Sequence, residues 1–205
     1  QYVYYDKEKR SVSSIAGNAY HESLRLYFTS LQQDGVELSL PEMEEIAFSY
    51  IDNVPANEWK PSKTCPTIEE CRIKASKSVS ALLRNFYDER SIYTEAAGEI
   101  LGIELYCREF LTVNGVDIPL PCNAVIDLVF RHKDGRVIIV DHKTRSRYTD
   151  AEDVAFTCGK QAIVYVLAYE AKEGVAADEV WFVENKESKN KDGSPQLAKQ
   201  VMAMD

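Results

Sequence analysis

Apolar positions in the first half of the chain follow a helical period over three segments. Between residues 13 and 33 they recur every three or four positions, and Asp34-Gly35 forms a stop signal. Residues 41–52 begin with the acidic run PEMEE, which suits the positive end of a helix dipole. Residues 67–88 show the helical period again after a polar, proline-containing loop. Three helices are predicted, and the last two form a helical insertion over about 36–90.

The pattern changes after residue 90 to the period of two that is typical of strands. Segments 100–113, 122–131 and 136–143 are rich in β-branched and aromatic residues. They are separated by Asn114-Gly115 and Asp134-Gly135, which are hairpin signals. Three antiparallel strands are therefore predicted in the middle of the chain.

Helical spacing returns over residues 152–173, and Gly174 ends it. The segment EVWFVE, residues 179–184, predicts a last strand, and the polar tail over 185–196 is expected to be mobile. The order is helix, three strands, helix and strand, with two inserted helices. It predicts an α/β protein in which helices and a sheet are layered.

Composition sets the class of protein. The chain has 205 residues, of which 45% are hydrophobic, and this suits one globular domain over residues 1–205. No apolar run reaches the roughly 18 to 20 residues of a membrane helix, and the N-terminus lacks the apolar core of a signal peptide. We expect a soluble, cytoplasmic protein without membrane contact. The first residue is Gln rather than Met, as in a processed chain or a fragment of a longer one.

Charge and cysteine content narrow the possible partners. A net charge of −9 argues against a broad basic groove that holds nucleic acid by counterion release alone. Phosphate contacts should therefore be local, or helped by bound cations. The five cysteines are scattered and no pair forms a CxxC motif, which favours free thiols in a reducing compartment.

Two acids occupy unusual places in the strand segments. Asp127 interrupts an apolar strand, and the apolar run VIIV leads directly into Asp141-His142-Lys143. A two-residue turn at Asp134-Gly135 would place Asp141 opposite Leu128, with Asp127 on the other face. A three-residue loop that ends at Gly135 would place Asp127 opposite Asp141. We predict the three-residue loop, because Gly135 occupies the position of this loop that requires a positive φ.

With that loop, Asp127, Asp141 and Lys143 project from one face, and the two acids lie about 4.5 to 5.5 Å apart at Cβ. Two carboxylates this close repel each other unless a cation lies between them. Hard oxygen ligands on rigid strands suit Mg²⁺ or Mn²⁺. A lysine beside them can orient a water or neutralise charge that develops on a phosphate. This pattern indicates metal-assisted phosphodiester hydrolysis, while a salt-bridged polar strand end stays open on geometry alone.

Glu104 is a further candidate metal ligand. A two-residue turn at Asn114-Gly115 would pair Glu104 with Val125 and bring Glu104 to the face that carries Asp127. A bulge at one of the prolines that follow the turn would reverse this parity.

At these residues the chain resembles the PD-(D/E)XK nuclease superfamily. Its signature is an acid on one strand followed by (D/E)xK on the next, here Asp127 and Asp141-His142-Lys143. That short pattern alone is weakly specific. Two further motifs are similar to those of the RecB-like branch, GxxxH in GNAYH (17–21) and QxxxY in QAIVY (161–165). The resemblance spans residues 17–165 and implies a restriction-endonuclease-like αβββαβ core with a mixed central sheet, in the order predicted above.

The resemblance also implies roles for individual residues. Mg²⁺ or Mn²⁺ would be held by His21, Asp127 and Asp141 and by the backbone carbonyl of His142, whose side chain is expected to face away from the site. Lys143 would position the attacking water. Without the resemblance, His21 would be interpreted as a structural histidine at the margin of an apolar helix face.

Gln161 and Tyr165 are four positions apart and so share one face of a mostly apolar helix. A buried glutamine needs hydrogen-bond partners. In the resembling family this pair lines the active site and orders it. The alternative is an ordinary core tyrosine beside a satisfied glutamine.

Basic residues collect near the predicted site. Arg145 and Arg147 follow the strand and Lys160 precedes Gln161, so that all three can contact phosphates. A merely solvated loop is the alternative interpretation. Some related nucleases hold an iron–sulfur cluster through one upstream cysteine and three near the C-terminus. Because no cysteine follows Cys158, no such cluster is predicted here.

The sequence therefore predicts a metal-dependent deoxyribonuclease that acts as an exonuclease on DNA ends or single strands. The alternative is a non-catalytic, DNA-end-binding or structural module of a larger recombination or helicase complex. Metal binding without cleavage would favour that module.

Overall fold

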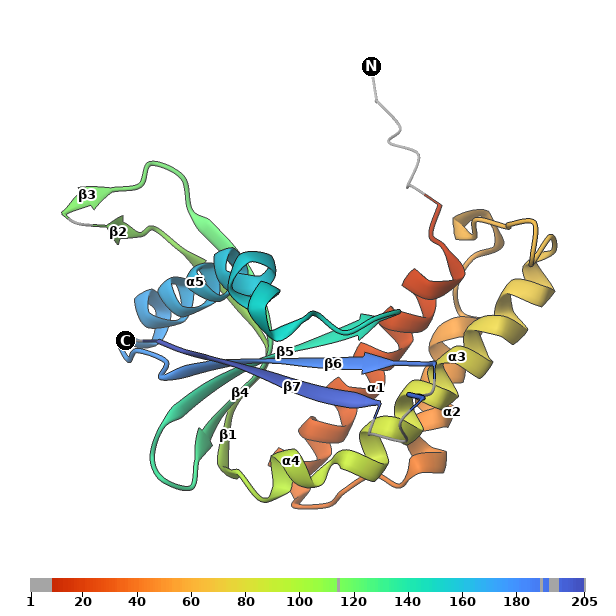
Figure 1. The fold of residues 1–205 in the computed structure, drawn as a ribbon, viewed down its shortest axis with the longest axis horizontal. Coiled ribbons are helices and arrows are strands. Elements are labelled where there is room, and N and C mark those ends of the chain that lie inside the picture. The colour runs from red at the N-terminus through yellow and green to blue at the C-terminus, as the bar shows by residue number, and fades with distance from the viewer. Residues whose placement is uncertain (1–8, 114, 189, 192–195, 205) are drawn as a thin grey trace.

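The computed structural model describes residues 9–113, 115–188, 190–191 and 196–204, and a five-stranded sheet forms its centre (Figure 1). The strand order is β1-β4-β5-β6-β7. Their bounds are β1 Ala97–Glu109, β4 Cys122–His132, β5 Val137–Arg145, β6 Glu179–Lys186 and β7 Leu197–Ala203. Neighbouring strands are antiparallel except β5 and β6, which are parallel. The prediction of a mixed central sheet is confirmed.

Helices cover both faces of this sheet (Figure 1). Helix α5, Val154–Glu173, connects the parallel strands β5 and β6 and packs on one face. The other face carries α1, Val12–Asp34, together with α2, Leu40–Asp52, and α3, Ile68–Glu89. A single turn, α4 at Ser91–Thr94, leads into β1, and two 3-10 turns occupy Ala56–Glu58 and Ala151–Asp153. The sheet is therefore buried between two apolar clusters, in agreement with the predicted layers.

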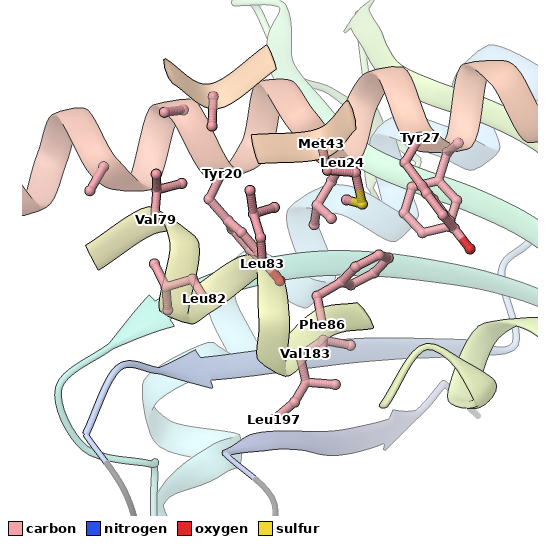
Figure 2. Close-up of a cluster of buried hydrophobic side chains, with 14 of the residues drawn as sticks. Tyr20, Leu24, Tyr27, Met43, Val79, Leu82, Leu83, Phe86, Val183 and Leu197 are labelled. Atoms are coloured by element: carbon pink, nitrogen blue, oxygen red, sulfur yellow. The ribbon is translucent and has the colours of Figure 1, made fainter. Parts of the chain in front are cut away.

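The larger cluster joins α1, α2 and α3 to the sheet (Figure 2). Tyr20 and Leu24 of α1 are buried against Leu83 and Phe86 of α3, and Val183 of β6 lies below them. Burying side chains of this size stabilises the fold by about 1.5 to 3 kcal/mol each. This cluster fixes α1 on the sheet, and α1 carries one candidate site residue.

The three predicted N-terminal helices are confirmed to within two residues at each end. Gly35 ends α1 with a positive φ of 66°, as the Asp34-Gly35 signal predicts. A capping box begins α3, because the Thr67 side chain accepts from the N–H of Glu70 and the Glu70 carboxylate accepts from the N–H of Thr67.

The loop between β4 and β5 contains three residues, as predicted. Leu128 pairs with Val140 and Arg131 with Val137, and this register leaves residues 133–135 between the strands. Gly135 has a φ of 97°, and its N–H donates to the carbonyl of His132 at 2.8 Å. Continued beyond its last pair, the same register places Asp127 opposite Asp141.

The predicted pairing of Glu104 with Val125 is wrong by two residues. Val125 pairs with Tyr106 instead. The pairs on either side of Glu104 are Ile103–Leu128 and Leu105–Ile126, so Glu104 lies opposite Asp127. The shift arises because the turn at 114–115 closes a separate two-stranded sheet, β2 Thr112–Val113 and β3 Val116–Asp117. A shift by two keeps the side-chain face, so Glu104 stays on the side of Asp127. Asn114 itself lies outside the described residues.

The C-terminal part differs most from the prediction. Asn185 and Lys186 belong to β6, so the tail predicted to be mobile does not begin at 185. Strand β7 was not predicted, because each of its faces mixes apolar and polar residues in the sequence LAKQVMA, and only Leu197 in it is buried. Residues 189 and 192–195 of the predicted tail lie outside the described residues. None of the helices in the described part is long and apolar enough to cross a membrane.

Candidate metal and catalytic site

The candidate site forms where strands β4 and β5 separate. Their backbone pairing ends at Leu128 and Val140. One step further, Oδ2 of Asp127 accepts a hydrogen bond from the backbone N–H of His142 at 2.7 Å. Leu128 packs into the cluster under α1, whereas Ile126 packs into the cluster under α5. The alternation of faces is therefore interrupted at Asp127, which leaves its carboxylate at the gap between the strands.

Glu104 lies on β1 next to this gap. It has a φ of 47°, the one positive φ of a non-glycine residue in the described part of the chain. Such a backbone conformation costs about 1 to 3 kcal/mol and tends to occur at functional sites. The Glu104 carboxylate lies close to Asp127.

His21 reaches the same place from α1. A Cβ on Gly17 would lie 3.1 Å from Oγ1 of Thr144 in β5, so glycine permits the close approach of helix and strand. One turn later, Nδ1 of His21 lies 3.5 Å from Oδ2 of Asp127. The predicted closeness of Gly17 and His21 to the site is thereby explained by helix–strand packing.

These three residues form a group that fits a divalent cation. One ligand atom from each of His21, Glu104 and Asp127 lies within 4.8 Å of the others. Two carboxylates and one imidazole are ligands that suit Mn²⁺, and the carboxylates also suit Mg²⁺. Asp141, which the sequence also predicts as a ligand, lies outside this group, whereas Glu104, the further candidate, belongs to it.

The group has perturbed pKa values with clear causes. Burial lowers the pKa of His21, but the hydrogen bond and charge of Asp127 and the charges of Glu104 and Asp141 outweigh it and raise the pKa overall. Burial and the nearby Asp127 raise the pKa of Glu104. Burial would also raise the pKa of Asp127, but the hydrogen bonds and charges of His142 and His21 hold that pKa well below its usual range.

Asp141 is the centre of a second set of contacts, on the side of α5. Its Oδ1 accepts hydrogen bonds from Lys143 Nζ at 3.0 Å, Gln161 Nε2 at 3.0 Å and the Tyr165 hydroxyl at 2.9 Å. Gln161 Nε2 also donates to the Tyr165 hydroxyl at 2.6 Å. Three of the predicted catalytic residues therefore meet at one oxygen of a fourth.

The other oxygen of Asp141, Oδ2, is buried and lies 2.8 Å from Lys143 Nζ, so the ammonium pairs with both oxygens of this carboxylate. Burial is also the main cause that raises the pKa of Asp141, followed by Lys143, which lowers it, and Asp127, which raises it. A cation near Asp127 would relieve the repulsion between the Asp127 and Asp141 carboxylates, so the residues present fit a bound metal.

The side chain of His142 was predicted to face away from the site. This is correct with respect to Asp141 and Lys143 but wrong with respect to Asp127. Its ring is 3% exposed and lies on the α1 side, opposite Asp141 and Lys143. Its Nδ1 lies 3.6 Å from Oδ2 of Asp127, and its Nε2 shares a hydrogen bond with the Tyr93 hydroxyl at 2.9 Å. Strand alternation turns the ring away from Asp141, but the break at Asp127 brings that carboxylate back into its reach.

The three basic residues predicted to contact phosphates differ in environment. Arg145 has its Nε 3.4 Å from Oε1 of the fully buried Glu184, so it is held in a structural ion pair. Arg147 is 80% exposed at its side chain and pairs with Asp150 at 2.7 Å. Lys160 is exposed on α5, next to Gln161. Arg147 and Lys160 are thus more accessible to a ligand than Arg145.

Sequence reasoning missed the role of Glu184. Its carboxylate accepts from the N–H and the hydroxyl of Thr149, at 2.7 and 2.6 Å, and so anchors the loop that follows β5. Glu184 is the β6 partner of Lys143 in the parallel register. The signal was an acid that ends an apolar run, the same signal that singled out Asp141.

Comparison with known proteins shows the family of the chain. The family model of the PD-(D/E)XK nuclease superfamily matches residues 2–203. The chain therefore belongs to the PD-(D/E)XK nuclease superfamily, whose members are generally metal-dependent nucleases, and its fold is consistent with the restriction-endonuclease-like fold of that superfamily.

Two further comparisons add little. No curated protein matches the chain. A solved structure titled "Crystal structure of SSO0001" is similar at 12% identity and a TM-score of 0.30, covering 96% of this chain and 68% of that one. A likeness this weak carries no argument about fold or function.

Proposed function

We propose that this protein is a metal-dependent nuclease that hydrolyses phosphodiester bonds in DNA as an exonuclease, at DNA ends or on single strands. The observation that carries the proposal is that the site residues form two groups, one on each side of the gap between β4 and β5. His21, Glu104 and Asp127 converge on one side of it, within 4.8 Å. Asp141 and Lys143 pair on the other side at 2.8 Å.

Mg²⁺ or Mn²⁺ would be held by His21, Glu104 and Asp127, together with Asp141 and the backbone carbonyl of His142. When bound, the cation supplies a Lewis acid that stabilises the charge developing on the scissile phosphate. The raised pKa values of Glu104 and Asp141 support this assignment, because a cation favours the ionised forms that burial disfavours.

Lys143 acts on the attacking water. Its side chain is 24% exposed, and its ammonium is held by Asp141. It orients the water and offsets negative charge in the transition state. Gln161 and Tyr165 fix the Asp141 carboxylate through two hydrogen bonds to Oδ1, which keeps Lys143 in place.

The charge of the chain supports a locally held substrate. A net charge of −9 disfavours a long duplex footprint, whereas a strand end or a single strand needs few phosphate contacts. The exposed Arg147 and Lys160 supply two such contacts beside the site.

Cleavage of end-labelled linear duplex, circular duplex and single-stranded DNA with Mg²⁺ or Mn²⁺ tests the proposal. We expect linear and single-stranded DNA to be degraded from an end and circular duplex to stay intact. Asp127→Ala should abolish cleavage, while Glu69→Gln, which removes an exposed charge far from the site on α3, should leave it unchanged.

Three outcomes would contradict parts of this proposal. Full activity of purified Asp127→Ala protein would contradict the assignment of the site. Cleavage of circular DNA would contradict exonuclease action. Metal binding by the wild type without cleavage of any substrate would favour a non-catalytic DNA-end-binding module of a recombination or helicase complex.

A further inference from the structure

Tyr93 and the ring of His142 lie just behind the candidate site, and neither has a role in the reaction proposed above. His142 occupies the position between Asp141 and Lys143 on β5, with its ring on the opposite side of the strand. Tyr93 belongs to α4, a single turn that lies outside every motif of the sequence. Both side chains are buried, at 3% exposure.

The two side chains are joined by a hydrogen bond whose direction can be assigned. His142 Nε2 and the Tyr93 hydroxyl lie 2.9 Å apart. The carboxylate of Asp127 lies 3.6 Å from the other ring nitrogen, Nδ1, and favours the tautomer that carries its proton there. Nε2 is then an acceptor, so the Tyr93 hydroxyl donates to it.

The His142 ring is held on further sides by aromatic contacts. Phe28 of α1 stacks on it with ring centroids 5.9 Å apart and an angle of 22° between the planes. The His21 ring meets it edge-on at 6.3 Å. With the bond to Tyr93, these contacts leave the ring a single orientation and so fix the backbone of the residue that carries it.

That backbone makes the shortest hydrogen bond to Asp127. The N–H of His142 donates to Oδ2 at 2.7 Å, and the ring nitrogens of His142 and His21 approach the same oxygen at 3.6 and 3.5 Å. No hydrogen bond to Oδ1 of Asp127 occurs within the described part of the chain. One oxygen is thus held from three sides, and the other is left for a ligand.

We propose that Tyr93 and His142 act together as positioning residues that fix the Asp127 carboxylate for metal binding. Tyr93 holds the His142 ring, and His142 holds Oδ2 of Asp127 through its backbone N–H and through Nδ1. Partners that orient a metal ligand commonly change metal affinity by about 10- to 100-fold when they are removed. The inference rests on the proposed function, because it assigns Asp127 to the metal.

The chain offers isosteric variants and a matched control. Tyr93→Phe removes only the hydroxyl, and His142→Phe keeps a ring against Phe28 but removes both nitrogens. The control is Tyr27→Phe, because Tyr27 is buried in the same aromatic cluster, against Phe28 and Phe86, but its hydroxyl interacts with Glu37 rather than with His142.

Titration of Mn²⁺ into each purified protein, followed by calorimetry, gives the dissociation constant that decides the question. We expect His142→Phe to weaken Mn²⁺ binding by about tenfold or more and Tyr93→Phe by roughly threefold to tenfold. The double variant should bind as His142→Phe does, since residues that act as one unit are not additive. Tyr27→Phe should bind as the wild type. A structural role alone would lower the melting temperature of the variants without this pattern of affinities.

Wild-type-like Mn²⁺ affinity in both Tyr93→Phe and His142→Phe would overturn the inference, and so would additive losses in the double variant. DNA cleavage measured on the same preparations keeps the two claims apart. If the wild type cleaves DNA and the variants bind Mn²⁺ normally, only the role of Tyr93 and His142 fails. If the wild type binds no Mn²⁺, the metal centre fails and this inference with it.

Discussion

The Asp127 carboxylate takes the place of a strand neighbour by accepting a hydrogen bond from the backbone N–H of His142 at 2.7 Å. Antiparallel pairing between β4 and β5 stops one residue earlier, so the side chain satisfies a donor that no strand partner reaches. Asp127 therefore lies where the backbone pairing of β4 and β5 ends, and its side chain makes the hydrogen bond that follows the last strand pair. Such a position holds a carboxylate rigidly, as a metal ligand requires.

The hydrogen bonds to Asp141 should matter for activity more than for stability. Tyr165→Phe and Gln161→Leu each remove one donor to Oδ1 of Asp141, which then holds Lys143 less firmly. We expect each variant to lower kcat by about 10- to 100-fold with a small change in melting temperature. Steady-state cleavage and thermal unfolding measure the two effects. A variant that unfolds early but cleaves at the wild-type rate would show a purely structural role.

His21 should show a raised pKa in the metal-free protein. The folded protein then binds its proton more tightly than the unfolded chain does, so His21 contributes stability in full below about pH 6.5 and loses it as the pH rises through the folded-state pKa. Asp127→Asn removes the charge that raises this pKa most, while Glu104 and Asp141 still raise it and burial lowers it, so the pKa should fall. NMR titration of the imidazole measures the shift, with Glu69→Gln as the control. An unchanged pKa in Asp127→Asn would contradict the contact.

A larger side chain at Gly17 should push α1 away from β5. Even a Cβ there lies 3.1 Å from Oγ1 of Thr144, and a leucine cannot be accommodated without movement of the helix. We expect Gly17→Leu to lower the free energy of unfolding by about 1 to 3 kcal/mol. It should also weaken Mn²⁺ binding, because His21 moves with the helix. Denaturant unfolding and calorimetry test both effects, and wild-type values in both would contradict the close packing.

Glu184 should be needed for the loop that follows β5. Its fully buried carboxylate accepts two hydrogen bonds from Thr149 and pairs with Arg145. Glu184→Ala leaves these partners unsatisfied and should lower the free energy of unfolding by about 3 kcal/mol. The same denaturant series checks this value. Retained stability would show that the loop is held by other contacts.

Much of the fold follows from local signals in the sequence. The hairpin loop before β5 is predictable because only glycine readily adopts the positive φ that its third position requires. Helix α3 is predictable because its capping box and its apolar period agree. Strand β7 is not predictable, since it lies at the edge of the sheet and each of its faces mixes apolar and polar residues.

The candidate site, too, was predictable from the sequence only in part. The two aspartates stand out because charges in apolar strands are costly unless they have a function. The approach of Glu104 to Asp127 could not be predicted in detail, because it depends on an irregular backbone and on the small sheet inserted between β1 and β4. Tyr93 gave no signal at all, since its role depends on contacts between residues far apart in the chain.

The central claim is that Asp127 binds the metal whereas Lys143 acts on the reacting water. Mn²⁺ binding and DNA cleavage, measured in parallel on Asp127→Asn and Lys143→Met, test it most directly. We expect Lys143→Met to bind Mn²⁺ still but to cleave at least about a hundredfold more slowly, and Asp127→Asn to lose both binding and cleavage. Wild-type cleavage by Asp127→Asn, or by Lys143→Met, would contradict it.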